Sequence, residues 1–511
     1  MRRIDPTLRA ALAGAVLIAG CTSAPAPAPT PAPTAVAVDT TPAAAALPAA
    51  PARPIDTLPP QLGAAPSITL PPIVRRSLPN GLTLVVVEHH ELPVVDFVMV
   101  VGTGTEADPA RHTGLASLTA QLLREGTTTR TAPQLADQLA FLGARLSTTS
   151  GWDLSQIAMH VPAAQIDSAL ALFGDVVLRP AFAAADVDRL KKQRLTELLQ
   201  AKDRPPQIAD RIYASVLFGP SHPYGQPASG TEVTTRAITR SDITRFYQTY
   251  YRPNNATLIV VGDVTADDVE RRARSLFGGW TRRTVPQTRY PQTMAATKPT
   301  VVLVDKPGAP QSSIRIGAIG VARSTPDYFA LQVMNTILGG SFTSRLNQNL
   351  REKRGYTYGA RSSFGMRRHE GPFTASAEVT GTKTDSSLIE FMNELKAIRE
   401  NISTQEVERA KRYLQLQLPG NFETTQSIAF QLVPLVVYNL PLEYYSSYVQ
   451  NIEAVTLEDL QRVARRYVDP SRMSIVVVGD RASIEPAVRA LNLGTISIRD
   501  VSGAPITTPT P

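Results

Sequence analysis

Hydrophobic and polar positions alternate along the chain in a pattern that predicts short strands and longer helices. Apolar runs of strand length, some continuous and some alternating, stand at 82–88, 94–101, 154–161, 300–305, 312–319 and 373–379. Apolar residues at three- and four-residue steps predict helices at 132–142, 185–201, 325–338 and 404–416. Because the strands are grouped apart from pairs of helices, the pattern favours an α+β sandwich over a doubly wound parallel sheet.

Two segments far apart in the chain repeat one pattern. Residues 237–263 and 454–480 align without a gap at an offset of 217 residues, and ten of the 27 positions are identical. Each segment reads as an amphipathic helix, a turn containing proline and an apolar strand that ends in Val-Gly-Asp. The period is too long for a solenoid, so it predicts a duplicated domain.

The repeat and the changes in composition divide the 511 residues into segments. We expect a first domain over 70–285, a linker over 286–298, a second domain over 299–495 and a disordered tail over 496–511. Residues 21–68 are rich in alanine and proline, a composition with little to bury that favours an extended tether.

The first 20 residues are typical of a secretory signal peptide. Three arginines precede a short apolar core that is too short to span a membrane as a mature helix. The sequence Leu-Ile-Ala-Gly-Cys at 17–21 resembles a bacterial lipobox, in which the cysteine receives a lipid, so Cys21 is the predicted lipidation site. An ordinary signal peptide with an incidental cysteine is the alternative. Lipid chains on Cys21 would anchor the protein to a bilayer without spanning it.

The residues around Cys21 also bear on location and on cysteine chemistry. Thr22 stands where an aspartate would resemble an inner-membrane retention signal, so we expect an anchor in the outer membrane with the domains facing the periplasm. Cys21 is the only cysteine, which excludes a disulfide within the chain and a thiolate metal site in the mature domains. The formal charge of +8 is modest for this length, and no basic stripe is interleaved with aromatic residues, so no nucleic-acid partner is expected.

Several motifs resemble the insulinase/pitrilysin family of metallopeptidases, which includes the mitochondrial processing peptidase subunits. They are LPNGLTLVVVEHHELPVVDFVMVVGTGTEADPARHTGLASL and FGPSHPYGQPASG in the first half, and ILGGSFTSRLNQNLREKRGYTYG in the second. The resemblance covers nearly everything after the tether and implies two homologous α+β domains that face each other around a chamber. It also implies a His-x-x-Glu-His motif, in which two histidines bind zinc and the glutamate takes a proton from the zinc-bound water.

This chain departs from that motif at all three positions. Placed on the segment GLASLTAQLLREGT, the first histidine falls at Ser117, the glutamate at Ala120 and the second histidine at Gln121. Alanine cannot act as a base, and serine and glutamine are poor zinc ligands. Glu197 falls near the family's third ligand, where it reads equally well as a surface helix residue. We therefore expect no metal on this chain and no peptidase activity from it alone.

Other places for a metal or a nucleophile are less well supported. The cluster Glu88-His89-His90-Glu91 has ligand-type residues, but adjacent residues of a strand or turn point in different directions, so a solvated strand end is favoured. His112 is followed by no Glu-His pair at the right spacing, and no Gly-x-Ser-x-Gly motif occurs.

The second half keeps two residues that the resemblance marks as functional. In active members an arginine and a tyrosine seven residues apart grip the substrate and help to stabilise the oxyanion, and Arg351 and Tyr358 stand at that spacing. A guanidinium and a phenol are both good donors to developing negative charge. Tyr356 is a competing tyrosine at the wrong spacing. The structural alternative is an arginine at a polar helix end and a tyrosine on a strand.

A substrate strand is the third implication of the resemblance. The stretch 142–153 lies where the family presents an edge strand to an extended peptide, and Ser147 and Thr149 are its candidate contact residues. Leu146 replaces the family's usual asparagine there, and a plain half-buried strand is the alternative.

These observations together predict half of a two-chain enzyme. Some bacterial relatives divide the peptidase between one chain with the zinc motif and another with the Arg/Tyr pair, and this chain resembles the second kind. We expect a heterodimer with a zinc-bearing insulinase-family subunit, zinc on that partner and a peptide as substrate. The alternatives are a catalytically inert structural or assembly protein and a stand-alone peptide-binding lipoprotein.

Overall fold

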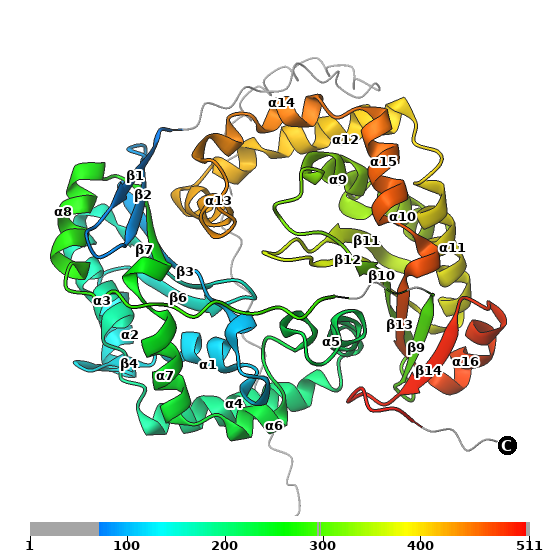
Figure 1. Cartoon of the computed structure of the whole chain (residues 1–511), viewed down its shortest axis with the longest axis horizontal. Coiled ribbons are helices and arrows are strands. Elements are labelled where there is room, and N and C mark those ends of the chain that lie inside the picture. Colours follow the sequence, from blue (N-terminus) through cyan, green and yellow to red (C-terminus); the bar gives the residue numbers. More distant parts are fainter. Residues whose placement is uncertain (1–70, 294–295, 297, 507–511) are drawn as a thin grey trace, which may run out of the picture. The chain divides into compact units, whose positions relative to one another are not determined.

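The computed structural model describes residues 71–293, 296 and 298–506 (Figure 1). Cys21, the predicted signal peptide and the predicted tether lie outside these residues. Within the described part, no helix has both the length and the apolar character needed to cross a membrane.

Each half of the chain builds one six-stranded mixed sheet. The first sheet has the order β1-β2-β8-β3-β7-β6. Its strands are β1 (Ile73–Ser77), β2 (Thr83–Glu88), β3 (Val94–Val101), β6 (Arg145–Ser150), β7 (Ser155–Pro162) and β8 (Ala256–Gly262). The second sheet has the order β11-β12-β10-β13-β9-β14. Its strands are β9 (Thr300–Asp305), β10 (Gln311–Ile319), β11 (Thr357–Phe364), β12 (Pro372–Thr380), β13 (Ser474–Gly479) and β14 (Thr495–Arg499).

Helices cover one face of each sheet with residues of the same half. In the first half they are α1 (Leu115–Leu122), α2 (Ala132–Phe141), α3 (Ile166–Leu178), α4 (Ala184–Ala201), α6 (Glu232–Ala237), α7 (Arg240–Tyr250) and α8 (Ala266–Phe277). In the second half they are α9 (Tyr328–Asn335), α10 (Arg345–Asn347), α11 (Thr384–Ala397), α12 (Thr404–Gln417), α14 (Tyr448–Glu453), α15 (Leu457–Tyr467) and α16 (Arg481–Ala490). A small hairpin of β4 (Gly126–Thr127) and β5 (Arg130–Thr131) follows α1. The predicted α+β class is confirmed.

The duplication predicted from the sequence holds at the level of strands and helices. Strand β2 begins at Thr83 and β9 at Thr300, which is the offset of 217 residues found in the sequence. Helix α7 and helix α15 keep the same offset, from Arg240 to Leu457. Read from opposite ends, the two sheet orders place β6 and β11 at equivalent edges. Strand β6, which carries the predicted peptide contact, and strand β11, which carries Tyr358, are therefore equivalent strands of the two repeats.

The two halves exchange one helix each, and this exchange covers the second face of each sheet (Figure 1). Helix α5 (Pro205–Phe218), from the first half, packs on β10 and β13 of the second sheet. Helix α13 (Thr425–Val437), from the second half, packs on β3 and β8 of the first sheet. Because each sheet buries apolar side chains under a helix of the other half, neither sheet is complete without both halves.

Polar contacts fix the exchanged helices in place. The Thr425 hydroxyl at the start of α13 donates to the buried Asp96 carboxylate of β3 at 2.6 Å. On α5, the Asp210 carboxylate accepts from Arg315 of β10 at 2.6 Å. Charge-assisted hydrogen bonds of this length are the stronger class, so they add orientation to the apolar contact.

The prediction of a disordered tail over 496–511 is wrong for its first residues. Residues 495–499 form β14, which pairs in parallel with β9 at the edge of the second sheet. The Ile498 side chain is buried there, and Asp500 accepts backbone hydrogen bonds from Ser502 and Ala504 in the turn that follows. The alternating isoleucines of this segment are a short strand pattern that composition alone concealed. The predicted domain and linker bounds stay a prediction.

Candidate functional site

Helix α1 presents the three altered motif positions. It begins after Gly114, whose φ of 91° lies in the left-handed region, and a Cβ there would lie 2.7 Å from the Ser229 carbonyl oxygen. The Asp108 carboxylate caps the helix, because it accepts from the backbone N–H groups of Gly114 and Ala116 at 2.7 and 2.8 Å. Burial raises the pKa of Asp108 to about 7. Ala120 is buried in the core.

The guanidinium of Arg194, on α4, lies between the altered positions. Its Nη2 atom donates to the Ser117 hydroxyl at 3.1 Å and to the Gln121 amide oxygen at 2.8 Å. Its Nη1 atom donates to the Ser229 carbonyl at 2.8 Å. The Arg194 residue is only 3% exposed, and burial lowers its pKa, yet a guanidinium stays charged in proteins. A permanent cation is thus held by the residues that stand at the two histidine positions.

Glu197 lies one turn further along α4. Its carboxylate is 4.0 Å from the Nε atom of Arg194 and accepts from Gln193 at 2.9 Å, with about half of the side chain exposed. The group Ser117, Gln121 and Glu197 therefore surrounds an arginine, and it offers neither two imidazoles nor a general base. Among the residues that the structure describes, no group of three or more His, Cys, Asp or Glu side chains could hold a metal ion.

The histidines that sequence reasoning considered take other roles. His90 pairs with Asp263 at 2.8 Å, and His89 lies 4.0 Å from Glu91. His112 lies 3.8 Å from Asp242. The His90 side chain is half exposed beyond the end of β2, whereas those of His89 and His112 are only 15% and 12% exposed.

Sequence reasoning missed Arg194 altogether. The signal was present in VDRLKKQRLTELLQ, because Arg194 precedes Glu197 by three residues and therefore shares its helix face. The sequence alone does not show that this face of α4 lies against α1, because the hydrogen bond between Arg194 and Gln121 joins residues 73 positions apart.

In the second half, Arg351 lies on a one-turn π-helix (Gln348–Lys353). Its guanidinium carbon is 4.5 Å above the ring of Phe342, and its Nε atom is 3.3 Å from Glu352. The Phe342 side chain is 60% exposed, so the cation–π contact is formed at the surface. Turns of π-helix are frequent at functional sites because they place side chains out of the α-helical register.

Tyr358 stands in a bulge of the edge strand β11. The pairing of β11 with β12 shifts register between Thr357 and Ala360. The Thr357 hydroxyl holds this irregularity, because it donates to the Glu378 carbonyl at 2.6 Å and accepts from the Gly359 N–H at 3.1 Å. A bulge re-aims the side chain that it carries. Tyr358 is 90% exposed, which suits a group that meets a ligand rather than one that packs in a core.

The predicted substrate strand is an edge strand. Strand β6 is the last strand of the first sheet and pairs only with β7 in the described part of the chain. Ser147 and Thr149 are both exposed and lie on one side of the strand, opposite Leu146 and Thr148. The free edge of β6 has the geometry to accept an added strand.

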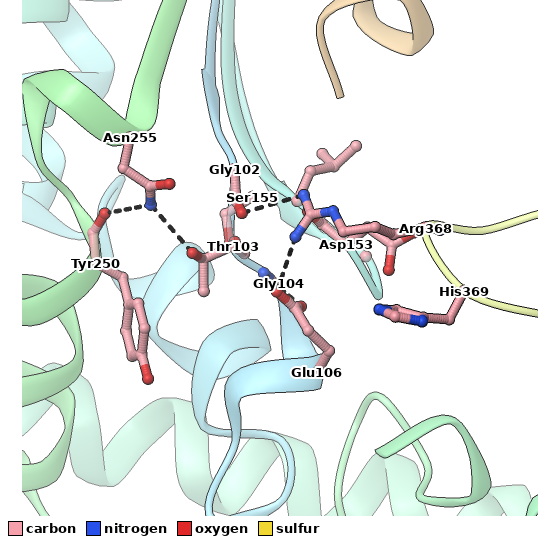
Figure 2. Close-up of polar contacts among 12 residues, drawn as sticks. Gly102, Thr103, Gly104, Glu106, Asp153, Ser155, Tyr250, Asn255, Arg368 and His369 are labelled. Atoms are coloured by element: carbon pink, nitrogen blue, oxygen red, sulfur yellow. Dashed lines mark hydrogen bonds and ion pairs between the residues drawn. The ribbon is translucent and has the colours of Figure 1, made fainter. Parts of the chain in front are cut away.

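A loop of the second half reaches the segment that leads into α1. In the β11–β12 hairpin, the Arg368 side chain donates to the carbonyl oxygens of Gly102 and Asp153 at 3.3 and 3.1 Å, and its backbone N–H donates to the Asp153 carboxylate at 2.8 Å (Figure 2). Its Nη1 atom lies 3.8 Å from the buried Glu106 carboxylate. The hairpin whose first strand carries Tyr358 is thereby attached to the first half.

Glu106 is held on the same segment. Its carboxylate accepts from the Gly104 N–H at 2.7 Å, and desolvation raises its pKa to about 8. The neighbouring Thr103 is fixed by Asn255, whose side chain donates to the Thr103 hydroxyl at 3.0 Å and to the Tyr250 carbonyl at 2.9 Å (Figure 2). Hydrogen bonds therefore hold the segment before α1, and both halves of the chain contribute to its position.

Two family patterns match this chain. The pattern described as "Insulinase (Peptidase family M16)" matches residues 84–220, and the pattern described as "Peptidase M16 inactive domain" matches residues 237–414. Together the two matches span more than half of the chain.

Known proteins of similar sequence and structure agree. An uncharacterized zinc protease of Mycobacterium leprae is 28% identical over 430 residues, which cover 82% of this chain and 95% of that protein. The crystal structure of a peptidase M16 inactive domain from Pseudomonas fluorescens superposes with a TM-score of 0.75 at 27% identity and covers 80% of this chain and 98% of its own. A protease from Helicobacter pylori has the same fold, with a TM-score of 0.75 at 21% identity over 80% of this chain and all of its own.

Proposed function

As the chain belongs to the insulinase family, peptidase family M16, we propose that it is the substrate-binding, non-zinc subunit of a heterodimeric peptidase. The observation that carries the proposal is the contrast between its two candidate sites. In the first half, Arg194 hydrogen-bonds to Ser117 and Gln121, the two residues that the resemblance puts at the histidine positions. In the second half, Arg351 and Tyr358 keep the family's spacing, and Tyr358 is fully open to a ligand.

The chemistry divides accordingly between two chains. The zinc of the partner subunit would activate the water that attacks the peptide. On this chain, the Arg351 guanidinium and the Tyr358 hydroxyl are donors that would stabilise negative charge on the carbonyl oxygen of the scissile bond. An exposed tyrosine in a bulge packs against no core, which supports a role in contact with a substrate over a role in a scaffold.

Substrate would be held as an extended peptide. The free edge of β6 offers backbone donors and acceptors, and Ser147 and Thr149 add hydroxyls on its exposed side. Backbone pairing is independent of sequence, so this strand alone would accept many peptides.

We further propose that the protein works in the cell envelope. Cys21 would carry the lipid, and the Ala/Pro-rich tether would set the domains at a distance from the outer membrane, on its periplasmic side.

The test is a pull-down of the tagged full chain from the envelope of its own source. The eluate is assayed for zinc and for cleavage of a quenched peptide. We expect a second chain with an intact His-x-x-Glu-His motif, zinc in the complex, and activity that falls on Arg351→Ala or Tyr358→Phe. The matched controls are Lys353→Ala and Tyr356→Phe, which alter the same segment at positions outside the pair.

One result would overturn the proposal. If the chain elutes alone, without zinc and without activity, the two-chain peptidase is wrong. A peptide-binding lipoprotein would then be the better description if labelled peptides still bind, and an inert assembly protein if they do not.

A further inference from the structure

A cavity of about 700 Å³ lies between α4, α5, α6 and the turn after β6, and Ser502 of the second half also lines it. Its apolar wall consists of Trp152, Leu198, Ala201, Ala214, Pro227 and Val233. This volume is within the range of sites that hold small ligands or large side chains. Neither the motif positions nor the Arg351/Tyr358 pair belongs to it.

Every charged side chain that lines the cavity already has a partner. Lys202 pairs with Glu232 at 2.5 Å. Asp210 pairs with Arg315 at 2.6 Å, and the Arg211 guanidinium donates to the carbonyl oxygens of Val501 and Ser502. These contacts engage the charged groups of the lining, and the six apolar residues form the rest of the wall, so the lining favours a neutral, apolar group over a charged one.

The cavity adjoins both parts of the first-half site. Ser229 lines it, and the Ser229 carbonyl is the acceptor of Arg194. Trp152 also lines it and follows the end of β6, at Ser150, by two residues. A peptide strand added to β6 would therefore lead from the open edge toward this cavity.

Trp152 is held in place by residues from both halves. Its ring lies edge-on to Tyr224, with 5.8 Å between the centroids, and the Arg367 guanidinium lies 4.3 Å from it on the hairpin loop of the second half. The Trp152 ring is therefore already in place as one wall of the cavity before a ligand binds. Val233, which also lines the cavity, is 77% exposed and so offers apolar surface that a bound side chain would cover.

We propose that this cavity binds a bulky apolar side chain, aromatic or branched aliphatic, of the peptide that pairs with β6. The inference deepens the proposed function and rests on its peptide-binding part, because it names the substrate class. Backbone pairing with β6 would bind peptides of any sequence, and the cavity would favour peptides with a bulky apolar side chain at one position. Burial of a leucine- or phenylalanine-sized side chain corresponds to about a ten- to hundredfold gain in affinity.

The experiment compares two neutral peptides on the full chain. They have equal length and differ only by phenylalanine or serine at one position, which is scanned along the peptide, and binding is followed by the anisotropy of a label on the peptide. At one position of the scan we expect phenylalanine to bind at least about tenfold more tightly than serine. Trp152 emission should shift with that peptide, whereas the other tryptophan, Trp280, is buried in the first core and should not respond.

Two exposed residues provide a matched pair of variants. Val233→Glu places a charge on the lining and should remove the preference for phenylalanine, while the serine peptide binds as before. Leu199→Glu makes the same change at a side chain that is 59% exposed on α4 but does not line the cavity, and it should leave the preference intact. Because both side chains are exposed, both variants should keep the thermal melting of the parent chain.

The outcomes separate this inference from the two-chain proposal. Equal binding of phenylalanine and serine peptides at every position, or an unchanged preference in Val233→Glu, would overturn the cavity proposal even if the zinc-bearing partner is captured. A preference that depends on Val233, in a chain that captures no partner, would support the cavity and overturn the heterodimer.

Discussion

The Nη2 atom of Arg194 donates a 2.8 Å hydrogen bond to the amide oxygen of Gln121, at the position where the family's motif has its second zinc histidine. The same nitrogen reaches Ser117, at the first histidine position. In an active enzyme a zinc ion would join α1 to α4 through its ligands. Here a fixed guanidinium makes that connection and also holds the Ser229 loop. A fixed positive charge thus joins the two helices, and a guanidinium donates hydrogen bonds but cannot act as a Lewis acid.

We predict that Arg194→Met destabilises the fold by about 2–4 kcal/mol. Methionine keeps much of the buried volume, but the hydrogen bonds to the Gln121 amide oxygen and to the Ser229 carbonyl are lost, and a hydrogen bond to a charged group contributes about 1.5–3 kcal/mol. Denaturant unfolding followed by circular dichroism measures the change. Lys192→Met, an exposed position on the same helix, is the control and should stay within about 0.5 kcal/mol of the parent.

The same reasoning predicts the response to a chelator. Since the connection between α1 and α4 consists of hydrogen bonds, EDTA should leave the melting temperature of the purified chain unchanged. A fall of several degrees with EDTA, restored by zinc, would contradict our account of the site.

Restoring the zinc motif should fail unless Arg194 is removed. We predict that the triple variant Ser117→His, Ala120→Glu, Gln121→His takes up no zinc, because the buried guanidinium repels the ion and occupies its place. Adding Arg194→Ala vacates the place and leaves Glu197 as a third ligand. That fourfold variant should bind about one zinc per chain.

Metal content after dialysis against zinc, with thermal melting in zinc and in EDTA, distinguishes the two variants. Arg194→Ala alone is the control, because it removes the guanidinium without adding histidine ligands. It should remain free of metal. If the triple variant binds zinc as well as the fourfold variant, Arg194 is not what excludes the ion.

Much of the fold follows from the sequence because the strands are strongly patterned. The apolar runs at 83–88 and 300–305 form strands of identical length at the predicted offset. The tail at 496–506 was missed, because a short edge strand such as β14 gains its order from pairing with β9 and not from its own composition. The exchange of α5 and α13 was also beyond the sequence, since an amphipathic helix does not specify which of two similar sheets it covers.

The candidate site divides in the same way. The loss of the zinc motif and the spacing of Arg351 and Tyr358 are local facts that the sequence carries. Arg194 and the contact of Arg368 with Glu106 join residues 73 and 262 positions apart, and such long-range pairs leave no periodic signal in a single sequence. The bulge that exposes Tyr358 likewise depends on the register of two strands.

Glu106 should make the stability of the fold depend on pH. Desolvation raises its pKa from 4.5 to about 8, so the folded chain retains a proton that the unfolded chain releases. The stabilisation is complete below pH 4.5 and is lost as the pH rises to about 8, with a slope of up to about 1.4 kcal/mol per pH unit. Asp108, raised to about 7, adds a slope of the same sign up to that pH.

Glu106→Gln isolates the contribution of Glu106. The amide keeps an acceptor for the Gly104 N–H but cannot ionise, so the variant should lose less free energy of unfolding than the parent between pH 5 and pH 9. Denaturant unfolding across this range measures both slopes. Glu91→Gln, at an exposed side chain, is the control and should follow the parent. Equal slopes for the parent and Glu106→Gln would mean that the Glu106 carboxyl is ionised throughout, as a partner of Arg368.

Tyr358→Phe should separate activity from stability. The side chain is 90% exposed, so removal of its hydroxyl should change the free energy of unfolding by less than about 0.5 kcal/mol. In the complex captured from the envelope, the loss of a donor to the oxyanion should lower kcat by about 100-fold and leave KM little changed, since the donor acts in the transition state more than in substrate binding. Phe342→Ala is the informative companion, because it removes the ring beneath Arg351 and should lower kcat through the position of that guanidinium, with partial rescue by Phe342→Tyr. If Tyr358→Phe raises KM at constant kcat, the tyrosine binds substrate and does not stabilise the oxyanion.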